Sequence, residues 1–322
     1  ALRNNTSGNP NDAFGYQALN NNTTGARNVA VGGYALTANV TGVENTAVGN
    51  AALASNLSND NTAVGYHALY ANTTGTPNDA FGAQALANNT TGAANVGVGY
   101  QSLYANTVGQ SNTGIGYGAL NASVTANNNT AVGANALNKN TAFSNTAVGS
   151  FALFANTTGS PNDAFGSSAL QSNTTGANNT AIGYQALYSN TIGTSNIGIG
   201  LTALYANTTG VNNTAIGVEA GHNNTTGSRN TAVGYGASYS NSTGLDNTSM
   251  GYAALNSNTG SYNTGIGSGA LQSNTTGAAN TAVGQGAAGG VTTGSQNTAL
   301  GVNAANGSVV LTTGSNLSLI HI

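Results

Sequence analysis

The sequence contains no cysteine and no tryptophan, and charged residues make up only 3% of its 322 residues. Without cysteine the chain can form no disulfide and no thiol-based metal or redox centre. The few basic residues are scattered along the chain at Arg3, Arg27, Lys139 and Arg229. An electrostatic nucleic-acid binder needs clustered lysine and arginine, so we expect no nucleic-acid partner.

Long apolar runs are also missing. None approaches the length needed to cross a membrane, so we expect no membrane span in this sequence. The chain opens in mid-repeat, because residues 1–8 match residues 18–25. We interpret the sequence as a fragment whose start lies upstream, which leaves the presence of a signal peptide untested.

One motif, Asn-Thr-Ala-Val-Gly, is repeated along nearly the whole chain, as at Asn61–Gly65. Its asparagine recurs every 17 residues, from Asn11 through Asn28 and Asn45 to Asn297, with three intervals of 16. A short fixed period predicts a solenoid in which each repeat is one coil stacked on the next.

The repeat is described by counting the motif asparagine as position zero. Position two is small, position three is a larger apolar residue, and position four is glycine in every copy. Position eight is usually leucine, and position eleven is usually asparagine followed by Thr-Thr-Gly. The β-branched motif bounded by asparagine and glycine predicts a short strand, and Asn-Thr-Thr-Gly predicts a surface corner.

These features predict an all-β parallel β-solenoid of about eighteen 17-residue coils. Parallel strands lie about 4.8 Å apart, whereas packed helices need about 8–10 Å. We therefore favour a short strand or tight turn after each motif. The alternative is a curved solenoid with one strand and one short helical turn per coil.

Residues 1–316 are predicted to form a single repeat domain. Residues 317–322 are a non-repeat tail, which we interpret as a sequencing artefact.

Side chains alternate faces along a strand, which leaves two alternatives for the core. Either position three points inward, or position two does and the apolar stripe at position three needs a partner. We assign the larger residues of positions three and eight to the core. Either alternative favours close approach of a second chain or of another face of the same coil. The assigned core residues are Val31, Val48, Val64, Phe81, Leu36, Leu53, Leu69 and Leu86. Stacked asparagines are expected to pair in ladders.

Candidate metal and catalytic residues are few. Asp12, Asp79 and Asp163 replace threonine at position one, but they lie four and five coils apart. A calcium site needs several oxygens around one ion. His67 and His222 have no second ligand at a suitable spacing. No nucleophile motif is present, so we predict no metal, no cofactor and no enzymatic activity.

Two columns of residues could form surface ladders. Threonine recurs at position twelve, as at Thr73, Thr90, Thr157 and Thr174, and tyrosine recurs at position five, as at Tyr66, Tyr100 and Tyr184. A threonine ladder would suit ice binding. A tyrosine ladder would suit glycans, although packing of the rings over the corner is the favoured interpretation.

The extended motif Asn-Thr-Ala-Val-Gly-Tyr-x-Ala-Leu-Tyr-x-Asn-Thr-Thr-Gly resembles the repeats of environmental (metagenomic) bacterial and phage tail-fibre-like proteins. Those proteins often carry an endosialidase-type chaperone at their C-terminus. The shorter motif is distantly similar to the coils of trimeric autotransporter adhesin heads. Both resemblances imply an extracellular homotrimer, on a cell surface or a phage virion. We predict a structural and adhesive rod with a cell-surface glycan or another surface as partner, and an ice-binding solenoid as the alternative.

Overall fold

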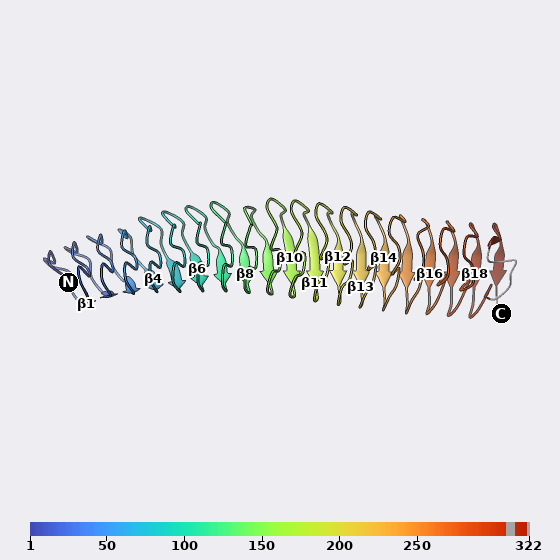
Figure 1. The fold of residues 1–322 in the computed structure, drawn as a ribbon, viewed down its shortest axis with the longest axis horizontal. Helices are drawn as coiled ribbons and strands as arrows, with labels where there is room; N and C mark the ends of the chain where they lie inside the picture. Colours follow the sequence, from blue (N-terminus) through green and yellow to red (C-terminus); the bar gives the residue numbers. More distant parts are fainter. Residues whose placement is uncertain (307–312, 321–322) are drawn as a thin grey trace. The chain divides into compact units, whose positions relative to one another are not determined.

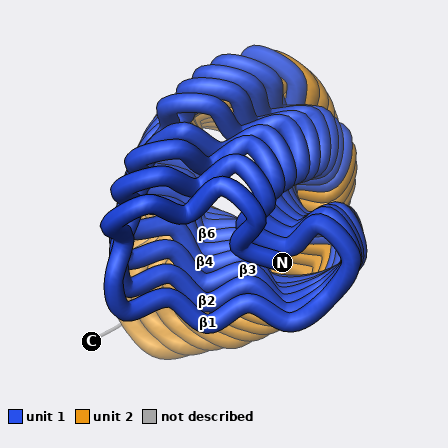
Figure 2. The backbone as a smooth tube through the Cα atoms, turned by 90° about the vertical axis from the view of Figure 1, so that its left-hand side faces the viewer, with its two compact units in different colours: residues 1–161 blue, residues 162–322 orange. Residues whose placement is uncertain are grey.

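The chain folds as an all-β parallel solenoid in the computed structural model, which describes residues 1–306 and 313–320. Each coil contributes one strand of three or four residues, and turns make up most of the rest of the coil (Figure 1). This confirms the predicted fold class. Contacts divide the chain into two compact units, residues 1–161 and 162–322, and the coils of each are stacked one on the next (Figure 2).

The first unit holds nine strands, and each pairs in parallel with the next. Equivalent residues lie opposite one another, so that Val64 pairs with Phe81. The strands are β1 (Asn11–Phe14), β2 (Asn28–Val31), β3 (Thr46–Val48), β4 (Asn61–Val64), β5 (Asn78–Phe81), β6 (Asn95–Val98), β7 (Thr113–Ile115), β8 (Thr130–Val132) and β9 (Thr146–Val148).

The second unit repeats this arrangement. Its strands are β10 (Asn162–Phe165), β11 (Asn179–Ile182), β12 (Ile197–Ile199), β13 (Thr214–Ile216), β14 (Thr231–Val233), β15 (Thr248–Met250), β16 (Thr264–Ile266), β17 (Thr281–Val283), β18 (Thr298–Leu300) and β19 (Ser318–Ile320). Strand β19 belongs to the predicted non-repeat tail, yet it pairs in register with β18. Residues 321–322 of that tail lie outside the described residues.

The segment after each strand is a series of tight turns. In the second coil, the Ala35 N–H donates to the Gly32 carbonyl and the Asn39 N–H to the Leu36 carbonyl, both three residues back. Tyr34 and Leu36 have φ of 62° and 50°, in the left-handed region. A right-handed helical turn cannot contain such residues, so the helical-turn alternative is wrong and the tight turn is correct.

The core lies on the side of the strand that carries positions zero and two. The alanines of position two and the leucines of position eight, including Leu36, Leu53, Leu69 and Leu86, are fully buried in most coils. The assignment of position three to the core was wrong. Val31 and Phe81 are 38% and 42% exposed, and Val48 and Val64 are half-buried on the outer side.

Two internal ladders of asparagine explain why the strand faces this way. The backbone and side-chain amides of Asn45 both donate to Asn28 Oδ1, at 3.0 and 3.1 Å. In the second ladder, Asn39 Nδ2 donates to Asn22 Oδ1 at 2.9 Å. The Gly42 carbonyl accepts from both Asn28 and Asn39. Because the position-zero amide must reach this carbonyl inside the coil, position three is turned outward.

Candidate binding surfaces

The outward side chains of each coil form three faces. We define the strand face as positions one and three, the turn face as positions five, six and nine, and the corner face as positions twelve to sixteen. Positions zero, two and four hardly change between coils, whereas position five is tyrosine, glycine, alanine, serine, leucine, valine or an amide. Positions that the fold leaves free to vary are where a repeat protein can carry binding residues.

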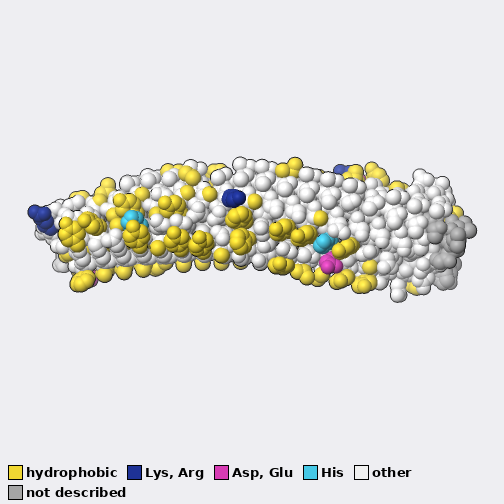
Figure 3. Space-filling view, in the orientation of Figure 1, with side chains coloured by type: hydrophobic (Ala, Val, Ile, Leu, Met, Phe, Trp, Pro, Cys, Tyr) yellow, Lys and Arg dark blue, Asp and Glu magenta, His cyan; other side chains and the backbone are white. Residues whose placement is uncertain are grey.

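The strand face carries a continuous column of apolar side chains at position three. In the first unit, Phe14, Phe81 and Ile115 are 78%, 42% and 38% exposed. In Figure 3 a row of hydrophobic side chains runs along the lower edge of the view, whereas the larger patches on its front lie beside the histidines and belong to the turn face. Contiguous exposed apolar surface of this kind marks an interaction site more often than scattered single residues do.

Threonines form a second column on the strand face, at position one. The second unit carries them in six consecutive coils, at Thr214, Thr231, Thr248, Thr264, Thr281 and Thr298. Within the described part of the chain, none of these six hydroxyls donates a hydrogen bond to a protein group. They are therefore free to bond to water or to a partner.

The corner threonines behave differently. The Thr73 hydroxyl donates to the Thr90 carbonyl at 2.9 Å, and the Thr90 hydroxyl to the Thr107 carbonyl at 3.0 Å. Thr174 repeats this contact with Thr191, and Thr157 is half-buried at the equivalent place. The predicted threonine ladder thus exists, but its hydroxyls donate to the backbone of the next coil and stabilise the stack.

The predicted tyrosines of the turn face do not form one continuous ladder in the first unit. Tyr66 packs on His67 with ring centroids 3.9 Å apart, and His67 packs on Tyr70 at 4.7 Å. Tyr100 lies parallel to Tyr117 at 5.6 Å. Because Ala83 separates the coils of Tyr66 and Tyr100, these clusters are local.

A longer aromatic column occurs in the second unit at position nine. Tyr188, Tyr205, His222 and Tyr239 stack in consecutive coils with centroids 5.0–5.2 Å apart. Tyr184, the predicted residue in this unit, is 52% exposed at position five. Ring faces that cover one another are not open to a ligand, so the column presents mainly ring edges.

Charged residues on the corner face pair between adjacent coils. Arg27 contacts Glu44, and Arg229 binds both carboxylate oxygens of Asp246 at 2.7 and 2.8 Å. The hydrogen bond from Arg229 lowers the pKa of Asp246, and the same contact raises the pKa of the guanidinium.

The described residues contain no cluster of three histidine or acidic side chains that could hold a metal. They also contain no apolar helix long enough to cross a membrane.

Two grooves on the turn face were not foreseen from the sequence. The groove of the first unit encloses about 370 Å³ and that of the second about 280 Å³. The first is lined by Tyr34, Thr37, Asn50, Ala51, Ala54, Ser55, His67 and Tyr70. The first forms at a coil with alanine at positions six and nine, Ala51 and Ala54, and the second at a coil with glycine at both, Gly286 and Gly289. The sequence does contain this signal.

Comparison with known proteins gives no family assignment: no protein-family model matches the sequence, and no curated protein sequence matches it. Function must therefore be argued from the three faces.

Proposed function

We propose that this chain is a structural and adhesive segment of an extracellular fibre, in which copies of the chain pack through their strand faces. The exposed apolar column at position three is the observation that carries the proposal. The resemblance to tail-fibre repeats and trimeric adhesin heads supports a homotrimer and an extracellular location. No catalytic role is assigned to any residue.

Burial of the apolar column would supply free energy of the same order as the cost of association. Full burial of a valine, isoleucine or phenylalanine side chain contributes about 1.5–3 kcal/mol. Position-three side chains such as Val31 and Phe81 still expose roughly 40% of their area, so each would gain about 1 kcal/mol. Four of the nine position-three side chains of the first unit are exposed to this extent or more, and the other five are half-buried. The nine coils would then contribute less than about 9 kcal/mol, which lies within the range of about 4–15 kcal/mol that association costs.

The oligomeric state in solution tests this proposal. We expect the wild-type chain to have the mass of a trimer by light scattering. Lysine at two strand-face positions, Phe81→Lys with Ile115→Lys, should dissociate it. The matched control places lysine on the turn face, Tyr66→Lys with Tyr100→Lys, and should leave the mass unchanged. A monomeric wild-type chain would contradict the proposal.

Ice binding is the second candidate, and the free hydroxyls of the position-one threonines favour it. Their column, beside the position-three column, gives a regular face of hydroxyl and methyl groups repeating about every 4.8 Å. The corner threonines are less suitable because their hydroxyls donate to the backbone. Both candidates use the strand face, so they exclude one another. Thermal hysteresis by a monomeric chain would favour ice binding over the fibre.

A further inference from the structure

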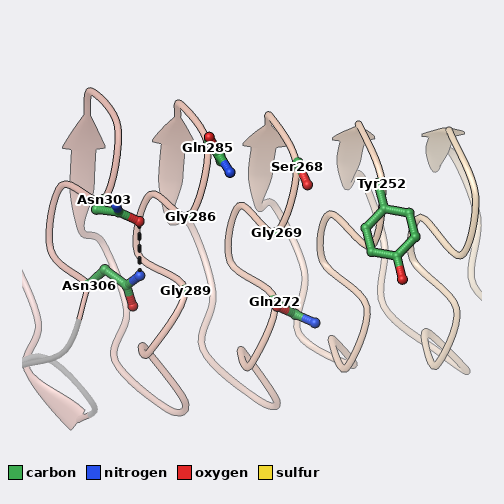
Figure 4. A pocket seen from close by; sticks show the side chains of 9 residues that line it. All are labelled: Tyr252, Ser268, Gly269, Gln272, Gln285, Gly286, Gly289, Asn303 and Asn306. Carbon is green, nitrogen blue, oxygen red and sulfur yellow. Dashed lines mark hydrogen bonds between the residues drawn. The ribbon is translucent and has the colours of Figure 1, made fainter.

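The groove of the second unit lies across four consecutive coils of the turn face (Figure 4). Tyr252 stands at one end, and Asn303 and Asn306 stand at the other. Its lining residues are Tyr252, Ser268, Gly269, Gln272, Gln285, Gly286, Gly289, Asn303 and Asn306. All nine belong to the positions that vary between coils, so the fold does not dictate their identity.

The hollow exists because glycine occupies positions where other coils carry long side chains. A Cβ built on Gly269 would meet only Gln272 Oε1, at 3.4 Å, which is an ordinary contact. Gly269 has a φ of 66°, but Gln101 adopts 54° at the equivalent position, so a side chain is tolerated there. Gly289 corresponds to Tyr239, which lies three coils earlier and one coil beyond the Tyr252 end of the groove. Packing therefore does not require Gly269. A Cβ on Gly286 would lie 2.4 Å from Asn303 Oδ1, the end of a flexible side chain, and one on Gly289 would lie 3.2 Å from the Gly286 carbonyl oxygen. Positions six and nine carry larger residues in other coils, so the groove follows from the choice of glycine here.

The chemistry of the lining is neutral and rich in hydrogen-bonding groups. Gln272, Gln285 and Ser268 are exposed and can both donate and accept. Asn306 Nδ2 donates to Asn303 Oδ1 at 3.2 Å, which leaves Asn303 Nδ2 and Asn306 Oδ1 for a ligand. A charged ligand would find no counter-charge among the lining residues. An apolar ligand would bury these amides without partners, which is unfavourable.

Tyr252 adds a flat apolar surface to this polar lining. Its ring is 61% exposed and lies parallel to the Tyr235 ring of the preceding coil with centroids 5.6 Å apart, and Figure 4 shows one ring face turned toward the viewer. A sugar ring has the matching character, because hydroxyls surround its edge and C–H groups cover its face. Amides for the hydroxyls and an aromatic face for the C–H groups together fit an uncharged carbohydrate.

We propose that this groove binds an uncharged linear glycan lying along the stacking direction. Equivalent groups of successive coils lie about 4.8 Å apart, close to the length of one sugar ring. Successive sugars would therefore meet Tyr252, then Gln272 with Ser268, then Gln285, and finally the Asn303–Asn306 pair. This deepens the adhesive part of the proposed function by naming a ligand class and its site.

Binding of three neutral hexasaccharides, cellohexaose, chitohexaose and maltohexaose, to the full chain tests the proposal by saturation-transfer NMR and calorimetry. Hexagalacturonate serves as the charged comparison. We expect at least one neutral hexasaccharide to bind and hexagalacturonate to bind at least roughly tenfold more weakly. Failure of all three neutral probes, or preference for hexagalacturonate, would overturn the proposal.

Two substitutions locate the site. Tyr252→Ala removes the aromatic face, and Gly289→Tyr fills the hollow with a residue that the chain already uses at this position. Each should weaken binding roughly tenfold or more, while Tyr184→Ala, which removes an exposed tyrosine outside the groove, should leave it unchanged. Circular dichroism verifies that each variant folds. Equal binding by wild type and Gly289→Tyr would overturn the assignment.

The outcome is separable from that of the fibre proposal. Glycan binding by a monomeric chain would support the groove and contradict the fibre. A trimer whose glycan binding is unaffected by Tyr252→Ala and Gly289→Tyr would contradict the groove alone.

Discussion

Ser123 and Ala126 depart from the repeat together, and each departure makes room for the other. Most other coils carry asparagine at position eleven and glycine at position fourteen, and a Cβ built on Gly109 would lie 2.3 Å from Asn106 Oδ1. Serine at 123 lacks that oxygen, so Ala126 fits and is fully buried. The ladder is interrupted as a result, and Asn106 Oδ1 and Ser123 Oγ have no hydrogen-bond partner.

Restoring both repeat residues should therefore repair the ladder, while restoring one should not. We expect Ser123→Asn alone to destabilise the chain by about 1–3 kcal/mol, because the new amide meets the Ala126 methyl group. Ser123→Asn with Ala126→Gly should instead be about 1 kcal/mol more stable than wild type, since Asn106 Oδ1 gains a donor. Chemical denaturation of wild type, Ser123→Asn, Ala126→Gly and the double variant gives the coupling energy; additive effects would contradict this account.

A close approach of backbones explains the glycine at position four. A Cβ on Gly65 would lie 2.5 Å from the Gly82 oxygen and 2.6 Å from its carbonyl carbon, and its φ is 140°. Gly65→Ala should thus cost about 2–6 kcal/mol through overpacking and backbone strain. Gly33→Ala is the control, because its Cβ would meet the flexible Asn50 side-chain amide at 3.1 Å and the Tyr16 carbonyl oxygen at an ordinary 4.0 Å. Similar denaturation midpoints for the two variants would argue against the close approach.

The Arg229–Asp246 pair should make the stability of the second unit depend on pH. The folded-state pKa of Asp246 is lowered by the hydrogen bond from Arg229. Its stabilising effect is then fully present above the unfolded-state pKa of about 3.9 and is lost as the pH falls through the lower folded-state value. Asp246→Asn should reduce the fall in melting temperature as the pH is lowered, and Glu219→Gln should not. An Asp246 titration midpoint by NMR at or above about 3.9 would contradict the lowered pKa.

The spacing of the motif asparagines is sufficient to predict the parallel register, because equal intervals place equal residues side by side. Val64 opposite Phe81 and the pairing of Asn28 with Asn45 follow directly. The inward face could not be chosen from the alternation of the strand, since both alternatives satisfy a period of two. Side-chain size favoured valine, at position three, as the inward residue. The deciding factor was the asparagine amide, which must reach the Gly42 carbonyl, and that contact joins segments distant within the coil.

The sites were less predictable than the fold. Counting residues was enough to find the threonine column of the corner. It could not predict that the Thr73 hydroxyl would donate to the Thr90 backbone carbonyl. The groove beside Tyr252 depends on side chains that are absent from adjacent coils. Glycines at positions six and nine indicate a groove only once it is known that the turn face points outward.

The corrected core makes a prediction within a single coil, where Leu69 is fully buried and Val64 is half-buried on the strand face. Leu69→Ala should cost about 2–5 kcal/mol through lost contacts and the cavity left behind. Val64→Ala should cost less than about 1 kcal/mol within one chain, because much of the valine already faces solvent. Chemical denaturation over a range of protein concentrations measures both. If copies pack through the strand face, the cost of Val64→Ala should grow with concentration while that of Leu69→Ala stays constant. Equal costs of Val64→Ala and Leu69→Ala at every concentration would indicate that position three lies in the core.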